Sequence, residues 1–394
     1  MSISRILRPW ASTLIFVFIV LILLLAVNYN SGKSKSKKHR LKVQRERMNS
    51  AQQSSDPHKS LSVNAWKQAF PWDVKPNRYL PNYYTYARYI NVTEKLLYRR
   101  GNIVYVHVPK SGGTTMGKCF TAAVKKLKRY QPNYYGPIGE NGIDAVLKNH
   151  KKSNSTKAAI FSGEYAFGLC EKLSASKPCS YFLMLREPYS RLVSSYLFCK
   201  RHSNDGNKFF CALNVNNMTI VEWALLQRSF LFRQLLMHED LCTGTYDDEY
   251  NFEDLLNIPK GLVKDKIPCW LKLQALIDST MTKDERMAAA VYLADSLEQW
   301  FAGVGILEEM DETLEALNIV YGLPVYPACT RMHANKAPSK NKKSDDALKQ
   351  RYMAQLKASP MVKDALYEDV LLYQRVKEIT KSQRAERKYV LMGE

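Results

Sequence analysis

The sequence predicts an α/β fold in the main body of the chain: a parallel sheet flanked by helices. Three segments rich in β-branched, aromatic and aliphatic residues read as strands, 103–108, 158–161 and 181–185. The first and the third run directly into helical patterns. Strand-then-helix units of this spacing favour parallel strands covered by helices.

The first strand leads into a turn of small residues. Pro109 ends the strand because it has no N–H to donate, and Gly112 and Gly113 allow a tight turn close to a ligand. One apolar helix face follows, formed by Met116, Phe120, Ala123, Val124 and Leu127. This arrangement aims free N–H groups and the positive helix end at an anion, and Lys110 adds a charge. The stretch therefore predicts a phosphate or sulfate cradle.

The turn is not a Walker A loop, which has four residues between its glycines and a lysine after the second. Here Lys110 precedes two adjacent glycines. Pro-Lys-Ser-Gly-Gly-Thr-Thr, residues 109–115, instead resembles the 5′-phosphosulfate loop of sulfotransferases that use 3′-phosphoadenosine-5′-phosphosulfate (PAPS). The lead-in Val-His-Val-Pro-Lys resembles the Golgi glycan sulfotransferases, especially the heparan sulfate 2-O and 6-O types. The alternative is a glycine turn that only joins a core strand to a helix.

A second motif follows the third strand, in Arg-Glu-Pro-Tyr-Ser-Arg-Leu-Val-Ser at residues 186–194. Arg186 at a strand end and Ser194 on the next helix can grip one phosphate from two sides, because the planar guanidinium bonds phosphate through two N–H groups. The pair resembles the 3′-phosphate motif of the same family, which implies that both residues hold the 3′-phosphate of PAPS. Either residue alone is also common as a surface Arg or a helix Ser. We expect Arg191 to pack as a supporting charge.

The resemblance also implies roles for the glycine turn. Backbone N–H groups of Ser111, Gly112, Gly113, Thr114 and Thr115 would hold the 5′-phosphate. Lys110 would stabilise the charge that builds on the bridging oxygen as the nucleotide leaves.

The proton acceptor is predicted near the end of the second strand. Many relatives have Gly-His where this chain has Gly163 and Glu164, although a Glu serves as the base in the heparan sulfate 3-O enzymes. Glu164 is therefore one candidate base. His150, in Lys-Asn-His-Lys-Lys, is the other, with a loop histidine among lysines as its alternative interpretation. His107 is expected to be a satisfied wall residue of the first strand.

A further basic segment contains Arg331, His333 and Lys336, where family members have a loop that closes over the nucleotide. A solvated basic loop is the alternative. No set of His, Cys, Asp or Glu residues has zinc spacing, so no metal is expected.

The remaining patterns complete the expected elements. Residues 131–157 are polar and rich in turn formers, 218–238 are helical, and 240–268 form an acidic insertion. Core helices are predicted at 270–277 and 286–297, a last strand at 301–307 and a C-terminal helix at 366–379. Asp311 is expected to cap the helix after that last strand.

The N-terminal region predicts a membrane anchor. No charged residue occurs from Trp10 to Val27, which is enough for one spanning helix, and no convincing cleavage site follows it. Ten Lys and Arg residues lie within residues 1–47, most of them after the apolar segment, and by the positive-inside rule they place the main body in the cytosol.

Other features favour the lumen of the secretory pathway. Sequons stand at Asn91, Asn154 and Asn217, and all eight cysteines follow the anchor. Cys199 and Cys211 bracket a polar loop as a disulfide would. Together with the family resemblance, these features lead us to expect a lumenal domain, against the charge count.

The expected organisation is a cytosolic tail (1–9), a transmembrane anchor (10–29), a stem with an aromatic strap (30–98), a catalytic domain (99–380) and a C-terminal tail (381–394). The aromatic residues of the strap either stack on sugars or, as we expect, pack back onto the catalytic domain. The resemblance implies a fold related to nucleotide kinases and a Golgi membrane enzyme that moves a sulfuryl group from PAPS to a glycan hydroxyl. A catalytically silent glycan-binding membrane protein is the alternative. The net charge of +21 suits polyanionic partners, but no nucleic-acid recognition motif occurs.

Overall fold

The computed structural model describes residues 80–86, 92–128, 130–138, 142–152, 157–174, 176–202, 211, 215–236, 267–324, 329 and 342–392. The chain forms two compact units, Met1–Pro71 and Trp72–Glu394, and every described residue belongs to the second. The predicted anchor, Asn91, Asn154, Lys336 and the insertion up to residue 266 lie outside the described residues. Within the described ranges, no helix has both the length and the apolarity that a bilayer crossing requires.

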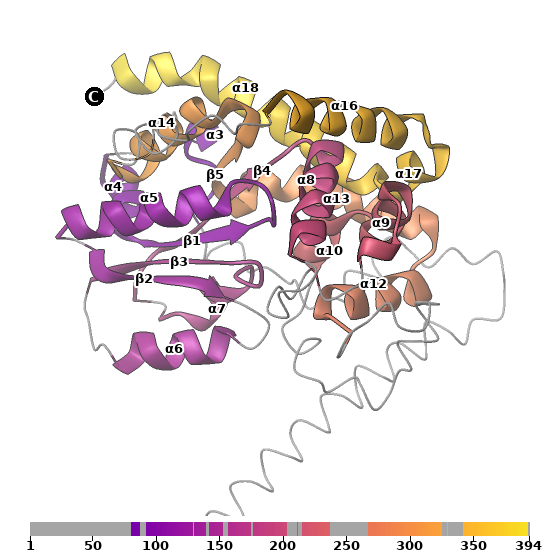
Figure 1. The fold of residues 1–394 in the computed structure, drawn as a ribbon. Helices are drawn as coiled ribbons and strands as arrows, with labels where there is room; N and C mark the ends of the chain where they lie inside the picture. The colour runs from indigo at the N-terminus through magenta and orange to yellow at the C-terminus, as the bar shows by residue number, and fades with distance from the viewer. Residues whose placement is uncertain are drawn as a thin grey trace, which may run out of the picture. The chain divides into compact units, whose positions relative to one another are not determined.

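A five-stranded parallel sheet forms the centre of this unit, in the order β2-β3-β1-β4-β5 (Figure 1). The strands are β1 Asn102–His107, β2 Tyr130–Ile138, β3 Ala158–Gly163, β4 Cys179–Leu185 and β5 Phe301–Ile306. From β1 the chain runs outward to β2 and returns to β3, whereas β4 and β5 lie on the other side of β1. The order therefore reverses between β1 and β4, and in open α/β sheets ligands bind beyond the carboxyl ends of the strands at such a point.

Four of the strands confirm the predicted α/β sheet, and the fifth corrects it. Residues 131–157, expected to be a polar segment of turns, contain strand β2 and helix α6 Gly142–Lys152. β2 lies at the edge of the sheet and its pairing with β3 has register shifts. Proline is tolerated on edge strands, so Pro132 and Pro137 are compatible with this strand while they obscure its pattern in the sequence.

One face of the sheet carries an aromatic-rich core. It is covered by helices α3 Tyr83–Tyr86, α4 Val92–Arg100, α5 Gly113–Lys126 and α14 Met310–Tyr321. Tyr83 is 1% exposed and its ring meets those of Tyr84 and Tyr98 edge to face, at 5.7 and 5.1 Å between centroids. The described part of the aromatic strap thus packs onto the sheet domain, as expected.

The other elements form a second, mainly helical core. It unites α8 Pro188–Arg201, α9 Ile220–Gln227, α10 Phe230–Leu236, α12 Cys269–Thr280, α16 Lys342–Ala358 and α17 Pro360–Ala365. Trp223 at its centre is fully buried and donates its indole N–H to Ser195 Oγ at 2.9 Å. Two long helices, α13 Lys283–Trp300 and α18 Tyr367–Met392, pack against each other and against β5. They confirm the helices predicted at 286–297 and 366–379.

Two helix boundaries differ from the prediction. The single helix expected over 218–238 is divided into α9 and α10, because Arg228 adopts a φ of 42° and ends α9. The Asp369 carboxylate then accepts N–H bonds from Leu231 and Phe232 at 3.2 and 2.9 Å, which fixes the start of α10 from a distant helix. Asp311 does not cap α14 either, because Glu309 is the N-cap residue and Asp311 lies within the first turn.

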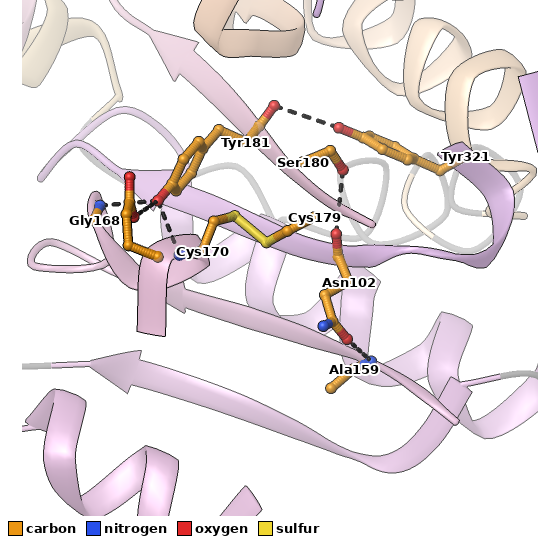
Figure 2. The surroundings of a disulfide bond; sticks show 9 residues. Asn102, Ala159, Gly168, Cys170, Cys179, Ser180, Tyr181 and Tyr321 are labelled. Atoms are coloured by element: carbon orange, nitrogen blue, oxygen red, sulfur yellow. Dashed lines mark hydrogen bonds between the residues drawn. A yellow bond between two sulfur atoms is a disulfide. The ribbon is translucent and has the colours of Figure 1, made fainter. Parts of the chain in front are cut away.

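Three disulfides join described cysteines. Cys199–Cys211 confirms the predicted bridge, and Cys119–Cys329 and Cys170–Cys179 were not foreseen. Figure 2 shows the surroundings of Cys170–Cys179, where the Tyr181 hydroxyl accepts bonds from the N–H groups of Gly168 and Cys170 at 2.9 and 3.0 Å. The disulfide and these bonds tie the segment that follows β3 to β4.

Candidate anion-binding pocket and adjoining acid

Three predicted site residues follow three neighbouring strands. Glu164 comes after β3, Lys110 follows the end of β1, and Arg186 comes directly after β4. Because β1 lies between β3 and β4 and all three run in parallel, these residues gather at one edge of the sheet. Neighbouring strands lie about 5 Å apart, so the three strand ends span about 10 Å.

The loop after β1 has the backbone of an anion cradle. Lys110 and Gly112 have φ values of 68° and 85°, and alternation of such left-handed residues with ordinary ones turns successive N–H groups toward one point. The N–H of Ser111 is engaged by Val108 O at 3.1 Å, and that of Thr115 by Gly112 O at 3.0 Å. Among the described residues, no backbone carbonyl accepts the N–H of Gly112, Gly113 or Thr114. Of the five N–H groups predicted for the cradle, these three therefore have no backbone acceptor within the described part of the chain.

Both glycines of the loop are required by their surroundings. A Cβ on Gly112 would lie 2.8 Å from Met184 Cε and 2.9 Å from Leu307 Cδ1, and its backbone is left-handed. A Cβ on Gly113 would overlap the imidazole of His107. The histidine ring therefore lies directly against the start of α5.

Arg186 connects the end of β4 to this loop. Its Nη1 donates to Lys110 O at 3.3 Å, and its Nε donates to Ser190 Oγ at 3.0 Å. Partial burial lowers the pKa of Arg186, while the charges of Glu308 and Glu187 raise it. Glu187 also caps α8 through the N–H of Ser190 at 2.6 Å, so the guanidinium sits on a fixed helix start.

An open pocket with an accessible volume of about 150 Å³ adjoins these groups. Lys110, Arg186 and Ser194 all line it, so the structure brings together the two motifs that are 76 or more residues apart. Its other described lining residues are Ser190, Val193, Leu197, Phe198, Arg201, Lys349 and Met353. The Lys110 ammonium lies 3.9 Å from the centre of the Phe198 ring, a cation–π contact. Four cationic side chains on one pocket suit a ligand with more than one anionic group.

Sequence reasoning missed the α16 wall of this pocket. Lys349 and Met353 come from a helix that begins 148 residues after Ser194, with no motif to associate them with the loop. Arg201 lies on the same face of α8 as Ser194, seven residues later, and helical spacing could have indicated it.

Glu164 lies on the other side of β1 from this pocket. It is 9% exposed, and its Oε1 is 3.8 Å from Nδ1 of His107. Glu164 also lines a narrow crevice with an accessible volume of only about 10 Å³, whose other described walls are Tyr165, Phe230, Arg233, Gln234, Trp270 and Leu273. An acidic group thus faces an aromatic crevice next to a cationic pocket.

The His107 imidazole is neutral near pH 7. Burial, and after it the positive charge of Lys110, lowers the pKa of His107 to about 4. His107, predicted to be a wall residue of the first strand, also lies against Glu164, the candidate base, which the sequence did not indicate.

His150 lies apart from both sites. It belongs to α6, where its ring meets Phe161 edge to face at 5.3 Å between centroids. Burial, and then the charge of Lys177, lowers its pKa. Lys177 precedes β4 and donates to Lys157 O at 2.7 Å, just before β3. His150 is thus located toward the amino ends of the strands, whereas Glu164 follows a carboxyl end.

Arg191 is 2% exposed and is not among the residues that line the pocket beside Lys110 and Arg186. Its burial lowers its pKa, and the nearby charge of Asp369 raises it. Within the described part of the chain, no group of three or more His, Cys, Asp or Glu side chains could hold a metal ion.

One comparison with known proteins identifies a family. The model described as "Sulfotransferase family" matches residues 96–375, which include the whole sheet, the loop after β1 and the α8 motif. No curated protein matches the chain.

Proposed function

Because the chain belongs to the sulfotransferase family, we propose that it transfers a sulfuryl group from PAPS to a hydroxyl of a glycan, a glycosaminoglycan-like polysaccharide. One observation carries the proposal: Lys110, Arg186 and Ser194 line a single pocket at the point where the strand order reverses. A nucleotide with phosphate groups at both ends of its ribose requires two separate grips. Arg186 and Ser194 line the pocket and would supply one, and the loop that continues from Lys110 would supply the other.

The donor would be held between the loop and α8. The N–H groups of Gly112, Gly113 and Thr114 fit the 5′-phosphate, and Arg186 with Ser194 fits the 3′-phosphate. Ser111 Oγ is buried without a hydrogen-bond partner among the described residues, which leaves one more polar atom at the cradle. Sulfuryl transfer, like phosphoryl transfer, passes through a loose, in-line transition state, and charge on the departing oxygen is its main demand. Lys110 would move away from the Phe198 ring and stabilise the negative charge on the departing oxygen.

The acceptor would approach from the Glu164 side. Phe230 and Trp270 line the same crevice as Glu164, and rings of this kind pack against sugars. The crevice has an accessible volume of about 10 Å³, so a sugar would bind across its mouth and not inside it. Arg233, Gln234 and Trp270 each carry a buried polar atom without a hydrogen-bond partner among the described residues. Glu164 then takes the hydroxyl proton as the oxygen bonds to sulfur.

The test is transfer of radiolabelled sulfate from PAPS to a panel of desulfated glycans. Wild-type protein should label at least one glycan, and Lys110→Ala should lose nearly all of this activity while it folds normally. Arg384→Ala serves as the control, because Arg384 pairs with Glu309 and Glu312 at the surface and none of these three residues lines the pocket. Near-normal transfer by Lys110→Ala would refute its role.

A catalytically silent glycan-binding protein is the second candidate, and the Glu at position 164 is the observation that favours it. Such a protein would keep the fold and bind heparin but release no adenosine 3′,5′-bisphosphate from PAPS. The same assay separates the two candidates, because labelled glycan appears only with the enzyme.

The proposal includes the compartment: a single-pass type II Golgi membrane protein with its catalytic domain in the lumen. Three disulfides between described cysteines support an oxidising environment. Asn217 of the sequon is exposed, so a glycosyltransferase can reach it. Asn217→Gln should remove one glycan from protein made in animal cells; an unglycosylated wild-type protein would contradict the lumenal placement.

A further inference from the structure

The register of two neighbouring strands puts His107 beside Glu164. Val106 of β1 is paired with Gly163 of β3, so the next residue of each strand end faces its counterpart. The imidazole and carboxylate meet there with Nδ1 and Oε1 3.8 Å apart. That separation is longer than a hydrogen bond, but catalytic contacts in ligand-free proteins are often long and shorten when substrate binds.

A third side chain holds the two backbones at this spacing. Gln234 of α10 donates from Nε2 to His107 O at 2.8 Å and to Glu164 O at 2.7 Å. Gln234 is 4% exposed, so these bonds are shielded from water. The spacing of the two backbones is therefore fixed by the fold, and only the two side chains need to move for the contact to shorten.

The imidazole also has a defined orientation. Its Nε2 side lies against Gly113, where a Cβ would overlap the ring. Its Nδ1 side therefore faces Glu164. One ring thus spans from the start of the anion cradle to the candidate base.

Burial, and after it the charge of Lys110, keeps this histidine neutral. Lys110 lies on the loop after β1 and opposes a second positive charge on the imidazole. Helix α10 also faces this site. Its Arg233 lines the crevice together with Glu164, and its Gln234 is uncharged. A neutral imidazole carries one N–H, and the adjacent carboxylate favours that proton on Nδ1.

We propose that His107 is a positioning residue for Glu164, donating its Nδ1–H to one carboxylate oxygen when the acceptor is bound. The inference rests on the proposed function. The acceptor O–H bond breaks and its proton moves to the other carboxylate oxygen of Glu164, while His107 keeps its own proton. The acceptor oxygen bonds to sulfur, and the bond from sulfur to the bridging oxygen breaks to release adenosine 3′,5′-bisphosphate.

Two substitutions separate the donor from the bulk of the ring. Asn at position 107 can place an amide N–H near the position of Nδ1, whereas Leu fills the space without a donor. His107→Leu should lower kcat by roughly 10- to 100-fold, within the range of a lost charged hydrogen bond, with the KM for PAPS unchanged. The pH below which kcat declines should also be higher in His107→Leu, by about one pH unit. A hydrogen bond to the Glu164 carboxylate favours its ionised form, so without the bond Glu164 is protonated at a higher pH. His107→Asn should keep kcat within about fivefold of wild type and retain the wild-type pH profile.

A spectroscopic measurement tests the same contact without sulfate transfer. In ¹⁵N-histidine-labelled full-length protein in detergent, the His107 signal is identified among the seven histidines by its loss in His107→Asn. Wild-type His107 should be the neutral Nδ1–H tautomer near pH 7, and Glu164→Ala should shift it toward Nε2–H.

The outcomes are distinct. An Nε2–H tautomer in wild-type protein overturns the proposal, whether or not the variants fold. Equal kcat values and pH profiles for His107→Leu and wild type also overturn it, as does a His107→Asn protein as impaired as His107→Leu. If the tautomer is Nδ1–H but no glycan is sulfated, the contact stands and the proposed function fails.

Discussion

Arg186→Ala tests most directly whether Arg186 binds the 3′-phosphate of the nucleotide. In the ligand-free protein the guanidinium bonds Ser190 and the carbonyl of Lys110, and the pocket exposes it to a bound anion. A hydrogen bond to a charged group contributes about 1.5–3 kcal/mol, and about 1.4 kcal/mol is tenfold in affinity. Loss of the side chain should therefore weaken binding of adenosine 3′,5′-bisphosphate by about 10- to 100-fold.

The assay is isothermal titration calorimetry with two nucleotides, adenosine 3′,5′-bisphosphate and adenosine 5′-phosphate. Removal of Arg186 also releases Lys110 O and so disturbs the loop, and this indirect cost is common to both ligands. The difference between the two losses isolates the contact with the 3′-phosphate, as in a double-mutant cycle. The variant should lose most of its preference for the bisphosphate, whereas the surface control Arg384→Ala should bind both like wild type. Equal losses for the two nucleotides, or no loss, would refute the assignment.

Three further predictions concern the architecture around the site. Gly113→Ala should impair transfer at least tenfold and cost about 1–3 kcal/mol of stability in thermal melts, because its Cβ displaces the His107 ring. A Cβ at Gly303 has ordinary contacts, so the control Gly303→Ala should change neither transfer nor stability. Replacing Cys170 and Cys179 together by Ser should cost about 2.6 kcal/mol in urea unfolding, the loop-closure value for a separation of nine residues, and unchanged stability would contradict it. The pKa of His107 is lowered from 6.5 to about 4, so the unfolded chain binds a proton at a higher pH than the folded chain does. The free energy of unfolding of wild type should therefore fall by up to about 3 kcal/mol as the pH is lowered from 6.5 to 4. A His107→Asn protein whose stability has the same pH dependence would contradict this.

Local patterns in the sequence were sufficient to predict much of the sheet and the motifs of the proposed donor site. β1, β3, β4 and β5 are buried on both faces, so their apolar runs are visible without any tertiary information. The loop and α8 motifs are likewise local, and strand order alone brings Lys110 to Arg186. The bridge between Cys199 and Cys211 was predictable because it closes a short loop.

What the sequence did not reveal depends on contacts between distant segments. β2 is an edge strand interrupted by prolines, and its pairing with β3 cannot be inferred from alternation. The cap of α10 comes from Asp369, 138 residues after Leu231, and no local motif announces it. The pairing of His107 with Glu164 follows from the register of β1 and β3, which one sequence does not specify.

The α16 wall of the pocket shows the same limit. Lys349 and Met353 lie on a solvent-facing helix with an ordinary charged composition, so only the packing of α16 on α8 connects them with the nucleotide site. The Cys119–Cys329 bridge spans 210 residues and was likewise invisible.

The most direct measurement is a crystal structure of the protein with adenosine 3′,5′-bisphosphate. We expect the 5′-phosphate on the N–H groups of Gly112, Gly113 and Thr114, and the 3′-phosphate between Arg186 and Ser194. A nucleotide bound elsewhere, or one that reaches only one of these two grips, would contradict the account.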